Sequence, residues 1–168
     1  MRMIMASLSV ALAPAALAQS PAPQPSCPAT PAKLPAEFAS WARPVAVAAG
    51  TAAPVPVAVG RAMQVTLRPT AQVRYARPPE KPGAPNGHGG MLALDVARPG
   101  TYRVGLSAPA WIDVVRDGKA IASTAHGHGP DCSGIRKLVS FPLQPGRYLI
   151  QFAGNPAPQV TAIIVGPG

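Results

Sequence analysis

The sequence has 168 residues and carries 15 Lys and Arg against 6 Asp and Glu, for a net charge of +9. Such a balance favours anionic partners, such as nucleic acid, anionic lipid headgroups or acidic glycans. The two cysteines lie far apart in the chain, which excludes a redox or metal motif of neighbouring cysteines. Because the basic residues are spread along the sequence, we interpret most of them as solvated faces of strands.

The first 18 residues have the pattern of a secretory signal peptide. Arg2 precedes an apolar run over 3–13, and the small-residue cleavage signal Ala-Leu-Ala follows at 16–18. The run is too short for a membrane anchor, and no later run is long and apolar enough to span a bilayer. We therefore predict a periplasmic or secreted protein that begins at Gln19. Export argues against nucleic acid as its partner.

Residues 19–42 are predicted to form a proline-rich arm that ends in a short helical turn. Six prolines in its first 17 residues exclude helix and sheet ladders and favour an extended conformation. In the turn, Phe38 and Trp41 lie on one side and are expected to plug onto the domain. Cys27 of this arm is expected to form a disulfide with Cys132, as is typical of an even pair in a small exported domain.

Residues 43–168 are predicted to form an all-β domain. A Pro-rich stretch over 43–60 is placed along a sheet edge, and beyond it apolar residues alternate with the period of a strand. Short runs of this kind, bounded by Pro, Gly or Asn, predict an antiparallel, jelly-roll-like β-sandwich of about eight or nine strands. The strands are expected within 62–67, 72–76, 91–96, 101–107, 111–123, 137–152 and 159–165.

Two of these ranges contain predicted hairpin turns. Asp117-Gly118 is the pair that a two-residue type I′ turn requires, and Gln144-Pro145-Gly146 lies between two further apolar runs. The chain also repeats Pro-Gly-x-Tyr at 99–102 and 145–148. A turn that leads into a strand with an inward Tyr places the ring near a sandwich edge, with its hydroxyl expected to bond to backbone.

These Pro-Gly-x-Tyr strands, with SAPAWIDVVRDGKAI between them, resemble exported bacterial β-sandwich modules of the pre-peptidase C-terminal type over roughly residues 90–165. That resemblance implies a binding or accessory role without catalysis. The stretches AHGHGPDCSGIRK and EKPGAPNG are similar to those of a group of small exported bacterial proteins of unknown function. Members of that group often carry the name homogentisate 1,2-dioxygenase, which implies an iron-dependent oxygenase.

His126 and His128 are the candidate metal ligands for that alternative. Two residues apart on a strand, they point the same way and can hold one ion, with Asp131 or His88 as a third ligand. Two His and one carboxylate are the ligand set of non-haem iron oxygenases. The sequence departs from the cupin pattern, which has Glu soon after His-x-His, because Cys132 stands four residues after His128 and no histidine follows.

The glycines and proline of HGHGP also predict a loop, in which the histidines bond to backbone and Cys132 clamps the loop to the arm. We favour this interpretation of the segment over a metal site. A lone His-x-His is a weak signal for a metal site, because this pattern often arises by chance.

Other motifs in the sequence give only weak evidence for catalysis or binding. Around Ser133, the Gly-x-Ser-x-Gly elbow of serine hydrolases fails at both glycine positions. We interpret the carboxylates of Glu80, Asp95 and Asp113 as solvated or paired with neighbouring Arg. Trp111 is interpreted as a core residue and not as a platform for sugar rings.

Together these patterns favour an exported, disulfide-stapled β-sandwich that binds or scaffolds at the cell envelope, without catalysis or a cofactor. Its expected partner is an anionic envelope component or an envelope protein. A long basic loop rich in Pro and Gly supplies the candidate contacts to an anionic surface, through Arg74, Arg77 and Lys81. The alternative is a small metalloprotein with one iron, copper or zinc ion, such as an iron-dependent dioxygenase.

Overall fold

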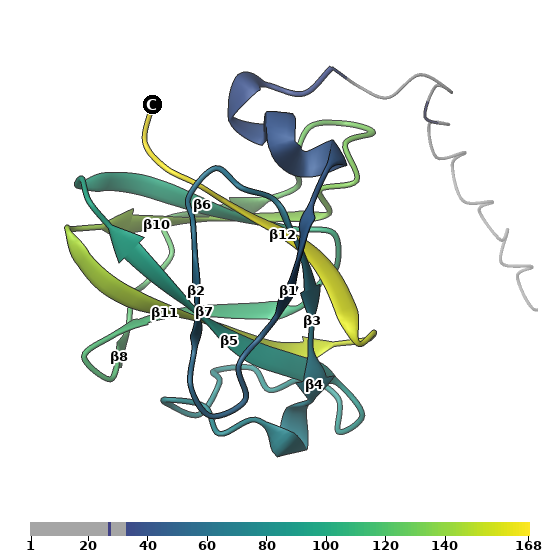
Figure 1. Cartoon of the computed structure of the whole chain (residues 1–168), viewed down its shortest axis with the longest axis vertical. Helices are drawn as coiled ribbons and strands as arrows, with labels where there is room; N and C mark the ends of the chain where they lie inside the picture. The colour runs from purple at the N-terminus through teal and green to yellow at the C-terminus, as the bar shows by residue number, and fades with distance from the viewer. Residues whose placement is uncertain (1–26, 28–32) are drawn as a thin grey trace, which may run out of the picture.

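The structure is a computed structural model that describes Cys27 and residues 33–168. The predicted signal peptide and most of the proline-rich arm lie outside the described residues. Within the described part, two mixed sheets form the predicted β-sandwich (Figure 1). No helix in that part is long and apolar enough to cross a membrane.

The first sheet contains six strands in the order β1-β3-β12-β6-β10-β9. Its neighbouring strands run antiparallel except β1 and β3, which are parallel, with Val45 opposite Met63. The edge strands are therefore β1 and β9. The bounds are β1 (Val45–Ala48), β3 (Met63–Thr66), β12 (Gln159–Val165), β6 (Gly100–Leu106), β10 (Lys137–Leu143) and β9 (Ala125–Gly127).

The second sheet has the order β2-β5-β11-β7-β8, and β4 also pairs with β5. Here β2 and β5 are parallel, and the other neighbours are antiparallel. The bounds are β2 (Val55–Val57), β5 (His88–Val96), β11 (Gly146–Asn155), β7 (Trp111–Arg116), β8 (Lys119–Ala120) and β4 (Arg68–Pro69). Two 3-10 helices, η1 (Ala36–Ala42) and η2 (Thr70–Gln72), complete the described elements.

The described part thus has more strands than the predicted eight or nine. The additional strands β1, β2, β4 and β9 are two to four residues long. Runs this short hold too few alternations to be recognised from a sequence. The two parallel pairs are β1 with β3 and β2 with β5. Their strands β1 and β2 follow one another along the same side of the sandwich, one in each sheet (Figure 1).

The core fills the space between the sheets and consists of alternate strand residues. Leu92, Leu94, Ile150 and Phe152 are among its fully buried side chains, and each such burial contributes about 1.5–3 kcal/mol to stability. A smaller cluster joins Phe38 of η1 to outward-facing residues of the first sheet. Trp41, which is partly buried, packs against the same cluster, so the predicted plug is confirmed for both aromatic residues.

The strand expected at 72–76 is wrong, because this segment forms the end of η2 and the start of a loop over 73–87. Two of its backbone amides donate hydrogen bonds to residues outside the strands. The Val73 amide donates to the Thr70 carbonyl, and the Arg74 amide donates to the Thr51 carbonyl. The apolar alternation in this segment instead lets Val73 be buried against the sandwich.

The turn at Asp117-Gly118 is confirmed, whereas the turn at 144–146 is not a hairpin. Asp117 and Gly118 both have positive φ, at 51° and 73°, as a type I′ turn requires, and join β7 to β8. By contrast, β10 and β11 belong to different sheets, so the turn at 144–146 carries the chain across the sandwich. The turn between β5 and β6 does the same in the opposite direction.

Each of these two crossings ends in a tyrosine corner, in which a Tyr hydroxyl bonds back to backbone four residues upstream. The Tyr102 hydroxyl donates to the Arg98 carbonyl at 3.0 Å. The Tyr148 hydroxyl donates to the Gln144 carbonyl at 3.0 Å and accepts from the Gln144 amide at 3.0 Å. The expected role of the repeated Pro-Gly-x-Tyr motif is confirmed.

Cys27 and Cys132 form a disulfide with a Cα–Cα distance of 5.5 Å, which confirms the predicted pairing. Cys132 lies in the loop between β9 and β10, directly after the histidines. The bridge therefore attaches the arm to this loop across 105 residues of sequence.

Candidate ligand-binding cleft

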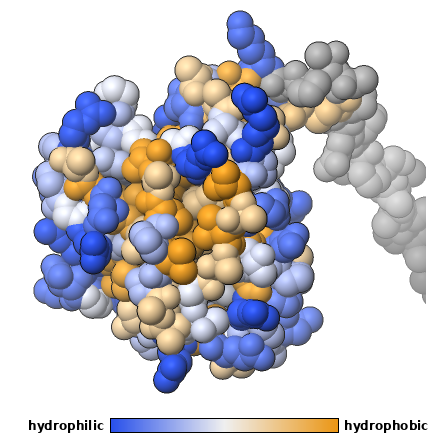
Figure 2. Space-filling view, in the orientation of Figure 1, coloured by the Kyte–Doolittle hydropathy of each residue, from blue (hydrophilic) through white to orange (hydrophobic). Residues whose placement is uncertain are grey.

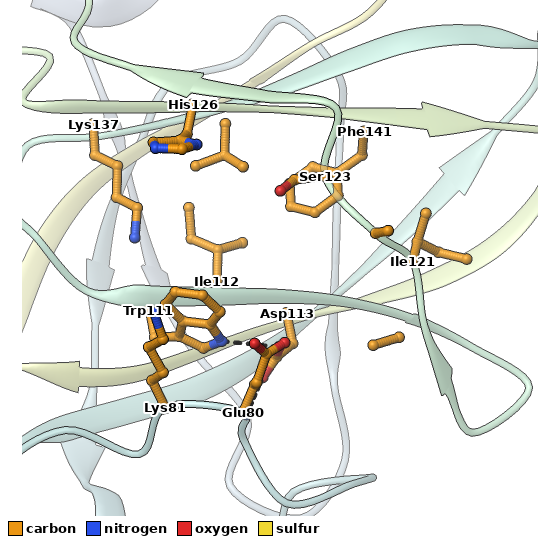
Figure 3. A pocket seen from close by; sticks show the side chains of 13 residues that line it. Glu80, Lys81, Trp111, Ile112, Asp113, Ile121, Ser123, His126, Lys137 and Phe141 are labelled. Carbon is orange, nitrogen blue, oxygen red and sulfur yellow. Dashed lines mark hydrogen bonds between the residues drawn. The ribbon is translucent and has the colours of Figure 1, made fainter.

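A cleft of about 630 Å³ opens between the sheets on the side of the sandwich where β8 and β9 are the edge strands (Figure 3). The second sheet contributes residues of β7 and β8, the first sheet contributes residues of β9 and β10, and loop 73–87 approaches from outside. The volume is in the range of pockets that hold small organic molecules.

The floor of the cleft is apolar and belongs to the main core. Ile112 of β7 and Val139 and Phe141 of β10 point between the sheets and are buried. Ile121, which follows β8, packs partly buried against the same core. An apolar part of a ligand in this cleft would be removed from water against these side chains.

Two lysines converge on Trp111 at the mouth of the cleft (Figure 3). The ammonium nitrogen of Lys81 lies 4.6 Å from the centre of the indole ring, and that of Lys137 lies 5.1 Å from it. Both distances are within the range of cation–π contacts. Among the described residues, neither lysine forms an ion pair with a carboxylate.

Lys137 is half-buried, and its Nζ donates a hydrogen bond of 2.7 Å to the Ala110 carbonyl. Burial lowers the pKa of this lysine below its ordinary value, and the nearby charge of Lys81 lowers the pKa further. Two repelling positive charges over an apolar floor create a positive potential at the mouth of the cleft. A bound anion would relieve this repulsion.

Asp113 is nearly fully buried, with an exposed fraction of 4%. Its Oδ1 accepts a hydrogen bond of 2.9 Å from Trp111 Nε1, and its Oδ2 accepts one of 3.2 Å from the Glu80 amide. The expectation that Asp113 is solvated or paired with Arg is therefore wrong, whereas Asp95 does pair with Arg147 at 3.0 Å. Asp113 orients the indole and holds the loop beside it.

Trp111 itself lies at the rim of the cleft, half-buried, and is not the core residue that the sequence suggested. The difference follows from its place at the start of β7. There the strand has no partner on the side of the cleft, because β8 pairs only with Val115 and Arg116.

Gln151 of β11 holds the other part of loop 73–87. This side chain is 1% exposed, and its Oε1 accepts from the amides of Ala76 at 2.9 Å and Arg77 at 3.3 Å. Its Nε2 donates to the Arg77 carbonyl at 3.1 Å. Sequence reasoning missed Gln151, because a polar residue on a strand is normally read as facing solvent.

The three residues predicted to contact an anionic surface do not all line the cleft. Arg74, Arg77 and Lys81 all belong to loop 73–87, but only Lys81 lines the cleft. The Arg74 and Arg77 backbones are held by Thr51 and Gln151, and Arg74 is exposed whereas Arg77 is partly buried.

The histidines lie at the edge of the first sheet. His126 of β9 lines the cleft and also a second, shallower hollow of about 350 Å³, which His128 lines as well. His128 Nδ1 donates to the Arg136 carbonyl at 2.7 Å, as the loop interpretation expects of a histidine in this segment. Both imidazoles are exposed.

The predicted metal ligands are not brought together. His126 and His128 share a hollow, but Asp131 lies beside Cys132 in the following loop, and His88 begins β5 in the other sheet. In the part of the chain that the structure describes, His, Cys, Asp and Glu form no group of three that could hold a metal ion.

The cleft also contains a hydroxyl, an imidazole and a buried carboxylate. The hydroxyl is that of Ser123 and the imidazole that of His126, and no hydrogen bond joins these two side chains. The carboxylate of Asp113 is occupied by its two donors. No protein-family model matches the chain, and no curated protein matches it.

Proposed function

We propose that this protein is an exported, non-catalytic binding protein whose cleft takes a small organic anion with an apolar or aromatic body. The observation that carries the proposal is the pair of ammonium groups without carboxylate partners, on Lys81 and Lys137, over Trp111 at the mouth of an apolar cleft in the described residues. The ammonium groups would hold the anionic group, and the core residues of the floor would hold its body.

The size and polarity of the cleft favour an organic anion over an inorganic one. Phosphate or sulfate would use only the rim, and the apolar floor beneath would remain hydrated. A carboxylate or sulfonate on an alkyl or aromatic body would bury that floor as well, at a gain of about 25 cal/mol per Å² of apolar surface. Lysines provide compact point charges, which suit an anionic group whose position is set mainly by its body.

The disulfide supports an oxidising compartment, where bridges of this kind persist. This agrees with the predicted export and with a role at the cell envelope. The metalloprotein alternative has less support, because the described residues do not assemble a third protein ligand beside His126 and His128. Two imidazoles alone make a weak metal site.

The test measures binding of octanoate and phenylacetate, each against its neutral primary amide, by isothermal titration calorimetry. We expect both anions to bind at least tenfold more tightly than their amides. The double variant Lys81→Gln/Lys137→Gln should remove that preference. Equal affinity for anion and amide would overturn the proposal.

The matched control is Arg74→Gln/Arg77→Gln, which removes the same charge from the same loop outside the cleft. It should leave the affinity for the anions within about twofold of the original. An equal loss in this control would mean that general electrostatics, and not the lysine pair, governs binding. Arg74 is exposed, and Gln151 binds Arg77 through its backbone groups, so the control should not disturb folding.

A further inference from the structure

The side of the sandwich opposite the cleft is formed by β1, β2 and their connection, over residues 44–60, called here the β1–β2 face. These residues include no charged side chain, and their only side chain with a polar group is that of Thr51. Figure 2 shows apolar surface in the middle of the molecule, where Figure 1 places β1 and β2. Hydrophilic residues surround this apolar area.

The β1–β2 face exposes small apolar side chains, and its larger ones other than Val59 are partly buried. Val45 and Val57 are partly buried against the core, whereas Ala46 and Pro56 are exposed. Val59 has an exposed fraction of 41% and is the one large apolar side chain in the described residues that counts as exposed. An apolar surface of this kind, bordered by polar residues, marks an interaction site.

Proline makes the β1–β2 face a poor edge for adding another strand. Pro44 precedes β1, and Pro54 and Pro56 lie before and within β2. Pro56 is the central residue of β2 and has no N–H to offer a further strand. Prolines on an edge protect a sheet from pairing with another chain. The face therefore suits a fluid apolar partner better than a second copy of this chain.

Two arginines converge at one end of this face. Because β1 and β3 are parallel with Val45 opposite Met63, Arg43 and Arg61 stand beside each other just before these strands. With Ser40 they line a hollow of about 340 Å³, called here the arginine notch. The Ser40 hydroxyl donates to the Gly60 carbonyl at 2.8 Å and accepts from the Ala62 amide at 2.9 Å, which fixes the notch.

The arginine notch has the chemistry of a phosphate site. Among the described residues, neither Arg43 nor Arg61 forms an ion pair, and both are exposed. Guanidinium groups present paired N–H donors that match the oxygens of a phosphate. Val59, the one large apolar side chain in the described residues that counts as exposed, lies two residues before Arg61 in the chain and so close to the notch.

We propose that the β1–β2 face docks onto the surface of an anionic phospholipid bilayer. A headgroup phosphate occupies the arginine notch, and Val59 and the small apolar side chains lie against the interface. Peripheral binding of this type combines buried apolar area with attraction to anionic lipids. This inference rests on a different side of the molecule from the cleft and does not depend on it.

The test uses the exported protein, with its N-terminus checked by mass spectrometry, in co-sedimentation with vesicles. Vesicles of phosphatidylcholine alone are compared with vesicles that also contain phosphatidylglycerol. We expect binding to the anionic vesicles and a loss of about tenfold or more in the partition coefficient for Arg43→Gln/Arg61→Gln. Val59→Asp, which places a charge on the apolar side chain's position, should weaken binding by a similar factor.

The matched control is Lys119→Gln/Arg136→Gln, which removes two exposed charges from the opposite side of the sandwich. It should retain binding within about twofold. An equal loss in this control would show non-specific attraction of a basic protein and overturn the proposal. Full binding by Val59→Asp would also overturn it, because the apolar face would then not lie against the bilayer.

A second copy of the chain is the competing occupant of the β1–β2 face. Light scattering over a range of concentrations distinguishes it, and we expect a monomer without vesicles. A dimer that Val59→Asp dissociates would assign the face to self-association and overturn membrane docking. Since Val59 and both arginines are exposed, unchanged circular dichroism should confirm that these variants are folded.

Discussion

Gln151 of β11 and Asp113 of β7 stand directly opposite each other in the second sheet, and both side chains are buried under loop 73–87. Gln151 binds the loop at Ala76 and Arg77, and Asp113 binds it at Glu80. This cross-strand pair therefore fixes the segment that brings Lys81 to the cleft. Two polar residues in neighbouring strands thus replace the hydrogen bonds that a ladder would give a regular strand.

Replacing Gln151 by Leu should destabilise the fold and weaken anion binding together. The change removes three hydrogen bonds and leaves the amides of Ala76 and Arg77 without this acceptor, at a cost of about 1–3 kcal/mol. Urea denaturation measures the first effect and calorimetric titration with octanoate the second. If the stability falls while the affinity stays the same, Gln151 does not position Lys81.

Anion binding should weaken with rising pH, and Lys137 should set where this begins. Because burial and Lys81 lower the pKa of Lys137 in the folded protein, this lysine loses its proton before an ordinary lysine does. Affinity therefore falls as pH rises through the lowered value. Titrations with octanoate from neutral to alkaline pH measure the profile, and Lys137→Gln should remove its first phase.

The proton on Lys137 should also affect the stability of the unliganded protein. Stability should rise with pH, whereas anion affinity falls. In the window between the lowered pKa and the ordinary lysine value, the unfolded chain binds more protons than the folded one. The free energy of unfolding attributable to Lys137 therefore rises with pH across that window. A pH series of urea midpoints for the wild type, compared with Lys137→Gln, measures this contribution. Identical slopes would contradict it.

The two tyrosine corners should differ in their contribution to stability. Tyr102→Phe removes one hydrogen bond, to the Arg98 carbonyl, and should cost about 1 kcal/mol. Tyr148→Phe removes the bonds with both backbone groups of Gln144 and the one from Arg116, so we expect a cost of about 2 kcal/mol. Thermal or urea denaturation of both variants ranks them. The reverse order would mean that the additional bonds of the Tyr148 hydroxyl add no stability.

Loss of the disulfide should destabilise the protein without altering the cleft. Cys27 and Cys132 are 105 residues apart, and a bridge that closes a loop of this length contributes about 2–5 kcal/mol. The variant Cys27→Ser/Cys132→Ser should therefore unfold at a lower urea concentration. Its affinity for octanoate in the absence of urea should match the wild type, because neither cysteine lines the cleft.

Metal content tests the alternative function directly. Because the described residues assemble no third ligand near His126 and His128, we expect much less than one equivalent of iron, copper or zinc. Elemental mass spectrometry on untagged exported protein provides the measurement. Near one equivalent, lost in His126→Ala/His128→Ala, would restore the metalloprotein hypothesis.

Features set by local geometry are the ones that the sequence predicts well. Asp117-Gly118 specifies a turn almost by itself, and the Pro-Gly-x-Tyr motif places a hydroxyl within reach of backbone four residues away. The same motifs do not say which sheet the next strand joins. For this reason the sequence predicts a hairpin at 144–146, where the chain instead crosses between the sheets.

The cleft depends on contacts between distant segments, and the sequence therefore shows only parts of it. Lys81 is selected for its charge, but its partner Lys137 comes from a strand 56 residues later and reads as one more solvated base. The segment 72–76 alternates like a strand, yet Gln151 binds the amides of Ala76 and Arg77 at its end. When a distant side chain takes the place of the hydrogen bonds of a neighbouring strand, the local sequence shows no pattern that reveals it.

The repeated crossings between the two sheets, two of which end in tyrosine corners, have a consequence for how the chain folds. From β5 to β12 the chain changes sheet at β5–β6, β6–β7, β8–β9, β10–β11 and β11–β12, so neither sheet can form before most of the sequence is present. Such non-local topologies fold slowly. For a chain predicted to leave the cytoplasm, slow folding would prolong the extended state that a translocation channel can pass.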